Sequence, residues 1–452
     1  MTPTLGDNRI DADGVLHVDG QRRFPLGLYQ HVTDVDFGKA LAAAGFNLMR
    51  CHANRDELDR IEAYGMGAWV ALGGSMVVRQ EKEATALQRT VDTLKTHPAT
   101  WVWEGPDEIL WNEYYSKLQK VDFQRWYKLD QLVAEKAAGG ETGELLDLHE
   151  KHKTYRNSAR WAEAEEFERR IRPLLNLPAD AGIQLSNWQD GLDATHAALA
   201  AGARIIREND DARPIWLNFA PRNTLDDLRW FGAIGDIIGC DIYPVPFHKQ
   251  LTHSDLADRN LSSTGGYTRR MLEAGDGRPV WMVLQGFGWS DDNADAWDPE
   301  VFVRPTYEEL RYMACDAIAN EARGLAWFGT SIAAGIEVPF WQGLKRLVRE
   351  LADIEDLLAA PDAGLDLRFV YDPTAQSMDR GVVACERRLG DRYVLVLANE
   401  NNRRLAFRID GLQPLNGRQL NVRGSWETLS VKDGSVRFGL PGMGCAILTT
   451  GE

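Results

Sequence analysis

The feature that most constrains this chain is an alternation of short apolar segments with amphipathic ones. Each apolar run has the length and residue types of a buried strand, each following segment has helical spacing, and Gly or Pro stands at the joints. The first four predicted strands are Phe24–Val32, Phe46–His52, Met66–Leu72 and Thr100–Trp103. The helices between them are predicted over Val35–Ala44, Asp56–Tyr64 and Glu81–Thr96. Repeated strand–helix units of this kind predict a (β/α) barrel.

The alternation stops after the fourth strand and resumes later. Residues 113–185 are polar, rich in Glu, Lys, Arg and Tyr, and show only helical patterns. We interpret them as an insertion in the fourth loop, which would emerge at the catalytic face of a barrel and restrict one end of its pocket. Four more strands follow, at Pro214–Phe219, Asp236–Tyr243, Pro279–Leu284 and Gly324–Gly329. The accompanying helices are predicted over Leu192–Asn209, Thr224–Gly232, Gly265–Glu273, Tyr307–Glu321 and Trp341–Leu358.

Both ends of the chain have a different pattern. Residues 8–24 alternate around Asp-Gly turns, which predicts a hairpin. Residues 366–452 alternate in short segments separated by turn residues, which predicts an antiparallel β-sandwich. The expected fold class is therefore α/β. The expected order is an N-terminal hairpin in residues 1–24, a (β/α)₈ TIM barrel in residues 25–360 with the helical insertion, and a C-terminal β-sandwich that braces the barrel.

Charge and composition narrow the possible partners. The net charge of −16 over 452 residues argues against nucleic acid. We also expect no membrane association, because no apolar run approaches a spanning length and the start has no secretory pattern. A cytoplasmic location is expected, or a periplasmic one if a signal peptide has been removed, and a homo-oligomer remains possible. The cysteines are predicted to be buried thiols without metal or disulfide; they are Cys51, Cys240, Cys315, Cys385 and Cys445.

Three carboxylates follow the fourth predicted strand at once. Glu104, Asp107 and Glu108 surround a Gly-Pro step in the stretch WEGPDE. In a parallel barrel this strand end lies at the catalytic face, so the carboxylates suit acid/base chemistry on a neutral polar substrate. The structural alternative is a solvated turn before a helix whose acidic first turn meets the helix dipole.

Polar and aromatic residues also follow the other predicted strands. A carboxylate that protonates, an Arg or Tyr that orients, and a Trp that stacks would together hold a sugar. The 15 Trp point the same way. Each residue taken singly could equally be structural, as an ion-pair partner or a core side chain. The candidate binding residues are His31, Arg50, His52, Asn218, Asp241, Tyr243, Gln285, Trp289 and Trp327.

Residues 10–360 resemble the retaining glycoside hydrolases of the (β/α)₈ superfamily that includes the β-galactosidases and cellulase-like enzymes. The segments that carry the resemblance are FNLMRC, WEGPDE, GCDIYP, PVWMVLQGF and RGLAWFG. The resemblance implies that Glu108 is the general acid/base and that Asp107 orients it. It also implies that Arg50, Tyr243 and Trp327 contribute to the sugar site. We expect no cofactor and no metal.

The pattern of that superfamily fails at the seventh strand. Its nucleophilic Glu is matched here by Gln285, and a neutral amide cannot act as a carboxylate nucleophile. Three alternatives remain open. Another carboxylate (Asp241, Asp291, Asp292 or Glu337) holds a water and gives inversion. The substrate's own 2-acetamido group acts as nucleophile beside Asp107 and Glu108, or the site binds carbohydrate without hydrolysing it.

Overall fold

The computed structural model describes residues 8–140, 143–246, 254–289, 304–329, 339–373 and 377–451. They form two compact units, one made of residues 1–107 and 202–452 and the other of residues 108–201. None of the described helices is both long enough and apolar enough to cross a membrane. The described cysteines are free thiols, most of them buried.

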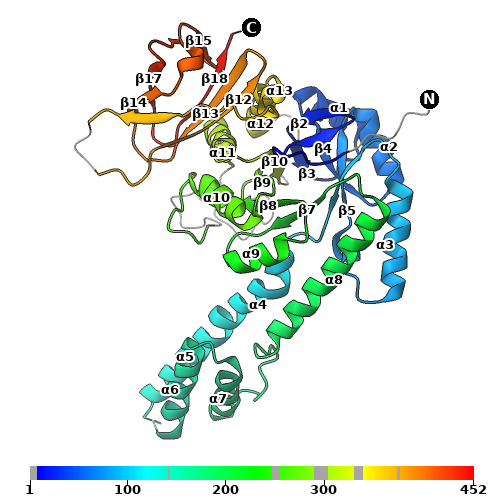
Figure 1. Ribbon diagram of the computed structural model, residues 1–452. Coiled ribbons are helices and arrows are strands. Elements are labelled where there is room, and N and C mark those ends of the chain that lie inside the picture. The colour runs from blue at the N-terminus through cyan, green and yellow to red at the C-terminus, as the bar shows by residue number, and fades with distance from the viewer. Residues whose placement is uncertain are drawn as a thin grey trace. The chain divides into compact units, whose positions relative to one another are not determined.

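The first unit contains a closed parallel barrel of eight strands, in the order β10-β3-β4-β5-β6-β7-β8-β9 (Figure 1). Closure comes from β10 pairing with β3 on one side and with β9 on the other. This confirms the TIM-barrel prediction. The strands are β3 Leu26–Tyr29, β4 Leu48–His52, β5 Gly67–Ala71, β6 Thr100–Glu104, β7 Ile215–Phe219, β8 Ile237–Ile242, β9 Val280–Gln285 and β10 Gly324–Phe328.

Helices follow the strands as predicted, with small differences at their ends. They are α1 Val35–Ala44, α2 Arg55–Tyr64, α3 Glu81–Leu94, α8 Trp188–Asn209, α9 Leu225–Gly232, α10 Ser263–Gly275, α11 Tyr307–Ala319, α12 Pro339–Ala352 and α13 Glu355–Leu358. The prediction of one helix over 341–358 is wrong, since the helix is interrupted between α12 and α13. Just after the break, Glu355 accepts a hydrogen bond from the backbone of Phe24 and pairs with Arg23, which ties α13 to the chain just before β3.

The barrel is filled by tryptophans that lie opposite glycines. Rings of Trp69, Trp216 and Trp281 occupy the interior core. A Cβ atom on Gly27 would lie 2.7 Å from the Trp69 ring, and one on Gly324 would lie 2.8 Å from the Trp281 ring. Glycine at these strand positions is therefore what admits such large side chains into a narrow barrel.

The N-terminal hairpin pairs β1 (Leu16–Val18) with β2 (Gln21–Arg23). Its turn residues, Asp19 and Gly20, both have positive φ, as a two-residue hairpin turn of this type requires.

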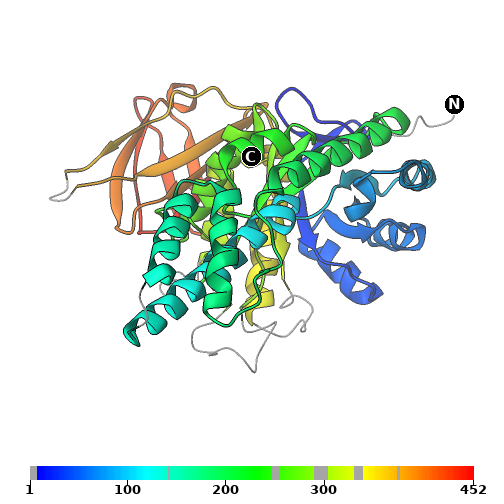
Figure 2. The same cartoon turned by 90° about the horizontal axis from the view of Figure 1, so that it is seen from below.

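The C-terminal part of the first unit has two antiparallel sheets, in the order β11-β14-β17 and β12-β13-β18-β15-β16 (Figures 1 and 2). Arg311 of α11 forms a partly buried ion pair with Glu350 of α12 (2.8 Å) and donates a hydrogen bond to the backbone carbonyl of Cys445. The sheets are therefore anchored to the barrel's outer helices. Their strands are β11 Arg368–Tyr371, β12 Val382–Leu389, β13 Arg392–Asn399, β14 Leu405–Asp410, β15 Gln419–Val422, β16 Thr428–Ser430, β17 Ser435–Leu440 and β18 Cys445–Thr450.

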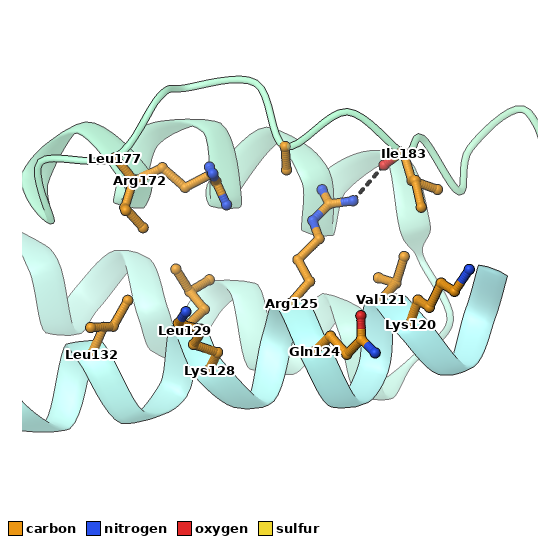
Figure 3. Close-up of a pocket in the computed structure, with 11 residues that line it drawn as sticks. Lys120, Val121, Gln124, Arg125, Lys128, Leu129, Leu132, Arg172, Leu177 and Ile183 are labelled. Atoms are coloured by element: carbon orange, nitrogen blue, oxygen red, sulfur yellow. Dashed lines mark hydrogen bonds between the residues drawn. The ribbon is translucent and has the colours of Figure 1, made fainter. Parts of the chain in front are cut away.

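The described residues of the second unit form helices and no strands, as predicted for the insertion. The chain runs from π-helical and α-helical turns (Trp111–Trp126, including α4 Ser116–Gln119) into α5 Tyr127–Ala138, α6 Gly143–Asn157 and α7 Trp161–Leu174. Apolar residues of all three long helices share one core. Glu168, almost fully buried, accepts hydrogen bonds from Arg125 and from Trp126 Nε1 (2.9 Å). A cavity of about 360 Å³ is lined by residues 120–132, by Arg172 of α7 and by the segment after α7 (Figure 3).

The glycine–tryptophan fit predicts a large cost for a small change. In Gly239→Ala the new methyl would lie 2.7 Å from Trp216 Nε1 and would meet the backbone of β9. Because a backbone atom cannot move aside cheaply, we expect a loss of about 1–3 kcal/mol of unfolding free energy by denaturant titration. Gly74→Ala is the control, since its methyl would meet nothing within 4 Å and its stability should stay within about 0.5 kcal/mol of wild type. Equal losses in the two variants would contradict this packing.

Candidate active site at the mouth of the barrel

Polar residues at the C-terminal ends of the strands lie at one end of the barrel, because all of its strands run parallel. Successive residues of a strand face opposite sides, and the interior core fixes which side is inward. Leu48, Val102 and Trp216 lie in that core, so the residues two places further on also face inward. The same alternation places the ends of the other strands. The resulting top layer consists of Tyr29, Arg50, Glu104, Asn218, Asp241, Gln285 and Phe328.

Glu104 holds three strands of this mouth together. Its side chain is fully buried and accepts a hydrogen bond from the hydroxyl of Tyr29 and one from Arg50 Nε (3.0 Å). The Arg50 guanidinium also lies over the Tyr29 ring, 4.7 Å from its centre. Residues from β3, β4 and β6 thus form one charged cluster, in which Arg50 keeps 24% of its side chain exposed to the mouth.

Burial changes the acidity of this cluster. The pKa of the Glu104 carboxyl is raised to about 7. Removal of water and the nearby charge of Asp107 raise it, and Arg50 and Tyr29 oppose the shift. Burial and the negative charge of Glu104 raise the pKa of the Tyr29 hydroxyl, so Tyr29 stays a hydrogen-bond donor. A carboxyl that titrates near neutrality is unusual, and such groups gather at functional sites.

Asp107 belongs to a second polar chain at the same mouth. Asn218 Nδ2 donates to Asp107 Oδ1 (3.0 Å) and lies 3.4 Å from Asp241 Oδ1. Glu104, Asn218 and Asp241 are buried, whereas Asp107 is partly exposed. Asp107 is therefore the carboxylate of this group that a bound molecule can reach.

Gln285 has its hydrogen bonds committed to the backbone. Its Nε2 donates to the carbonyls of Val245 (2.9 Å) and Phe287 (3.0 Å), and its Oε1 accepts from Val245 N (2.9 Å). The side chain is fully buried. It fixes the chain that follows β8 and the chain that follows β9. Trp289 Nε1 donates to the same Val245 carbonyl at 3.0 Å, so Trp289 is held by this arrangement too.

An aromatic wall stands beside the polar layer. The rings of Tyr243, Phe287, Trp289 and Phe328 contact one another with centroid distances between 5.0 and 6.2 Å. Two of these residues, Tyr243 and Trp289, are sequence candidates. The structure brings them together at the ends of β8 and β9.

Trp327 lies elsewhere. It is fully buried, and its ring contacts Phe46, which stacks on Trp341 of α12. By strand alternation Trp327 faces the helix layer, and the next residue, Phe328, faces the barrel interior. The sugar-stacking role that the resemblance implies for Trp327 is not compatible with this placement.

His31 and His52 form a separate cluster at the ends of β3 and β4. Their rings are stacked 3.5 Å apart, and His52 Nδ1 lies 2.9 Å from Glu57 Oε1 in the first turn of α2. Burial, helped by the charges of His52 and Arg50, lowers the pKa of His31 to about 4, so its ring is neutral near pH 7.

Glu108 directly follows Asp107 and is the first residue of the helical unit. Its φ of +49° is a conformation that non-glycine residues rarely adopt. The further carboxylates considered from the sequence, Asp291, Asp292 and Glu337, lie outside the described residues.

The sequence analysis placed Glu104 after the fourth strand and did not predict that its side chain faces the barrel interior. The fourth strand was predicted to end at Trp103, but it continues through Glu104. The signal that could have found this residue is the alternation itself, because Trp103 faces outward, where its Nε1 donates to Asp210 at 2.9 Å. Its neighbour must then face the barrel interior.

Comparison with known proteins gives matches by structure alone. No family model and no curated protein matches the sequence. A family 42 β-galactosidase from G. stearothermophilus is 9% identical over 94% of this chain and 98% of its own, with a TM-score of 0.53. A family 5 glycoside hydrolase from Bacteroides vulgatus is 14% identical over 98% and 92%, also with a TM-score of 0.53. The chain spans 62% of a β-galactosidase from a psychrophilic Marinomonas, with a TM-score of 0.46.

These similarities concern the fold. The chain shares with glycoside hydrolases a (β/α)₈ barrel followed by a β-rich C-terminal part, at identities too low to carry an activity across.

The buried carboxyl predicts a pH-dependent stability. Glu104 binds its proton more tightly in the folded chain than in the unfolded one, so its contribution to stability is present below about pH 4.5 and is lost as the pH rises through 7. Relative to Glu104→Gln, wild type should lose on the order of 3 kcal/mol over that interval, measured by denaturant unfolding at a series of pH values. Parallel pH profiles of the two proteins would contradict the assignment.

Proposed function

We propose that the protein is a glycoside hydrolase that cleaves the glycosidic bond of an oligosaccharide or simple glycoside. The observation that carries the proposal is the layer of carboxylates at the mouth of the barrel, where Glu104 is clamped by Arg50 and Tyr29, and Asp107 is oriented by Asn218. The shared fold with glycoside hydrolases supports it.

The proposed acid is Glu108. Glycoside cleavage needs a carboxylic acid that protonates the leaving oxygen and a second carboxylate that stabilises or completes the reaction. Glu108 adjoins Asp107 in the chain, and the resemblance noted above assigns its position to the acid/base. Asp107 is the proposed second carboxylate because Asp241 and Glu104 are buried. It would hold either a water molecule or a 2-acetamido group of the substrate.

The neighbouring residues suit a polyhydroxylated ligand. Arg50 offers a partly exposed guanidinium. Tyr243 and Trp289 provide aromatic faces of the kind on which sugar rings stack.

Gln285 favours a second candidate function, carbohydrate binding without hydrolysis. A retaining double displacement needs a carboxylate nucleophile, and this position holds a buried amide bonded to Val245 and Phe287. Hydrolysis must therefore proceed without a nucleophile at this position. A site that has lost the nucleophile would keep the binding residues and give no turnover.

The direct test is turnover of a panel of aryl glycosides, including N-acetylhexosaminides, by wild type and by Glu108→Gln. On substrates with poor leaving groups the substitution should lower kcat by about 10²–10⁴-fold, because protonation by a positioned acid contributes that much. Activated aryl substrates should be affected much less, since their leaving groups need little protonation.

The matched control is Glu113→Gln. Glu113 lies in the same helical segment, is exposed and pairs with Lys117 at 3.1 Å, so its substitution should leave both substrate classes at wild-type rates. Unchanged rates in Glu108→Gln on both classes would remove Glu108 from the mechanism.

Gln285→Glu separates the two candidate functions. The new carboxylate oxygen would face the carbonyls of Val245 and Phe287, so thermal stability should fall. If the enzyme works without a carboxylate at this position, activity should fall as well. A wild type without turnover on any glycoside, together with an active, retaining Gln285→Glu, would instead identify a binding protein that has lost its nucleophile.

A further inference from the structure

His31, His52 and Glu57 converge outside the carboxylate layer. His31 follows β3, His52 ends β4, and Glu57 lies in the first turn of α2. One ligand atom from each of the three lies within 4.8 Å of the other two. Three side chains that can ligate a metal ion, from three separate parts of the fold, thus lie close together.

Each of the two imidazoles faces the Glu57 carboxylate with its Nδ1 atom. His52 Nδ1 is 2.9 Å from Glu57 Oε1, and His31 Nδ1 is 3.5 Å from Glu57 Oε2. The His31 nitrogen is buried and, within the described residues, makes no hydrogen bond. A buried nitrogen of this kind normally has a partner.

The carboxylate is fixed independently of the two rings. Glu57 Oε2 accepts a hydrogen bond from the backbone N–H of His52 at 2.9 Å. This bond ties the start of α2 to the end of β4 and holds the carboxylate beside both rings. His52 is 62% exposed and His31 is 25% exposed, so an ion can reach the cluster from solvent.

We propose that His31, His52 and Glu57 bind a divalent transition-metal ion such as Zn²⁺, with water completing its coordination. Two imidazoles and one carboxylate suit zinc, cobalt or ferrous iron better than magnesium or calcium, which prefer oxygen ligands. Binding moves the two stacked rings slightly so that both Nδ1 atoms face the ion. Each ring stays neutral and carries its one proton on Nε2, so any proton on Nδ1 moves to Nε2 through solvent.

A second group with similar residue types does not share these properties. His97 approaches Asp59 and Glu62, but its Nδ1 already accepts a hydrogen bond from the backbone of Ala99 (3.2 Å). Its Nε2 lies 2.9 Å from Asp59 and 3.7 Å from Glu62. This histidine joins α2 to the chain before β6, and no second imidazole accompanies it.

The test measures metal binding and is independent of whether the barrel hydrolyses glycosides. Metal-free protein is titrated with Zn²⁺ by calorimetry and with Co²⁺ by visible absorption. We expect one ion per chain at this site and a visible Co²⁺ band. His31→Phe, His52→Phe and Glu57→Gln should each weaken Zn²⁺ binding by at least about 10²-fold, since even substitutions outside the coordination sphere cost about 10–100-fold.

Phenylalanine keeps an aromatic ring in the stack and removes the nitrogen, and glutamine keeps an acceptor for the His52 backbone, so the variants should fold. Their thermal unfolding without metal checks this. Glu62→Gln, on the same helix, is the control and should bind Zn²⁺ as wild type does. The proposal is overturned if the three variants bind Zn²⁺ as tightly as wild type, or if wild type binds no ion.

Discussion

The mouth of this barrel depends on one buried carboxyl. Glu104 receives hydrogen bonds from Tyr29 and Arg50, and so joins the ends of three strands around a charge that water does not reach. The cost of that burial is offset by the Arg50 charge and by two hydrogen bonds. Asp107 lies close enough to raise the pKa of the same carboxyl.

The aromatic residues that fill the barrel exclude water from Glu104. Tyr29 packs against Trp69 and Trp216, with ring centroids 5.4 and 5.9 Å away, and these rings seal the interior below the polar layer. The tryptophans fit because glycines on other strands of the barrel lie against their rings. The packing of the tryptophans in the barrel interior therefore affects the pKa of Glu104 at the mouth, and with it the chemistry that the carboxylates can support.

Much of this architecture could be predicted from local patterns. Strand and helix periodicity gave all eight barrel strands, the helical insertion and the C-terminal sheets, because each element buries one face and leaves the other polar. The domain boundaries drawn from composition remain predictions. The break between α12 and α13 escaped, since it depends on the long-range ties of Glu355 to Arg23 and Phe24.

The site was harder to predict than the fold. Strand-end positions correctly gathered Arg50, Asn218, Asp241 and Gln285 at one mouth, but which neighbour faces inward depends on the register of each strand. A shift of one residue explains why Glu104 was expected in the loop after the strand and Trp327 at the mouth, whereas the structure places Glu104 in the strand and buries Trp327. Two contacts could not be predicted from residue types. The hydrogen bonds of Gln285 to the backbone and the pairing of His31 with Glu57 each join residues from separate segments of the chain.

The central claim is that Glu104 is a desolvated acid that titrates near neutrality at the barrel mouth. Infrared difference spectroscopy of the carboxyl C=O band, recorded for wild type and Glu104→Gln across pH 4 to 9, measures this directly. The account predicts a protonated-carboxyl band that is present only in wild type and disappears with a midpoint near pH 7. Identical spectra of the two proteins, or a midpoint at the ordinary value for glutamate of about 4.3, would contradict it.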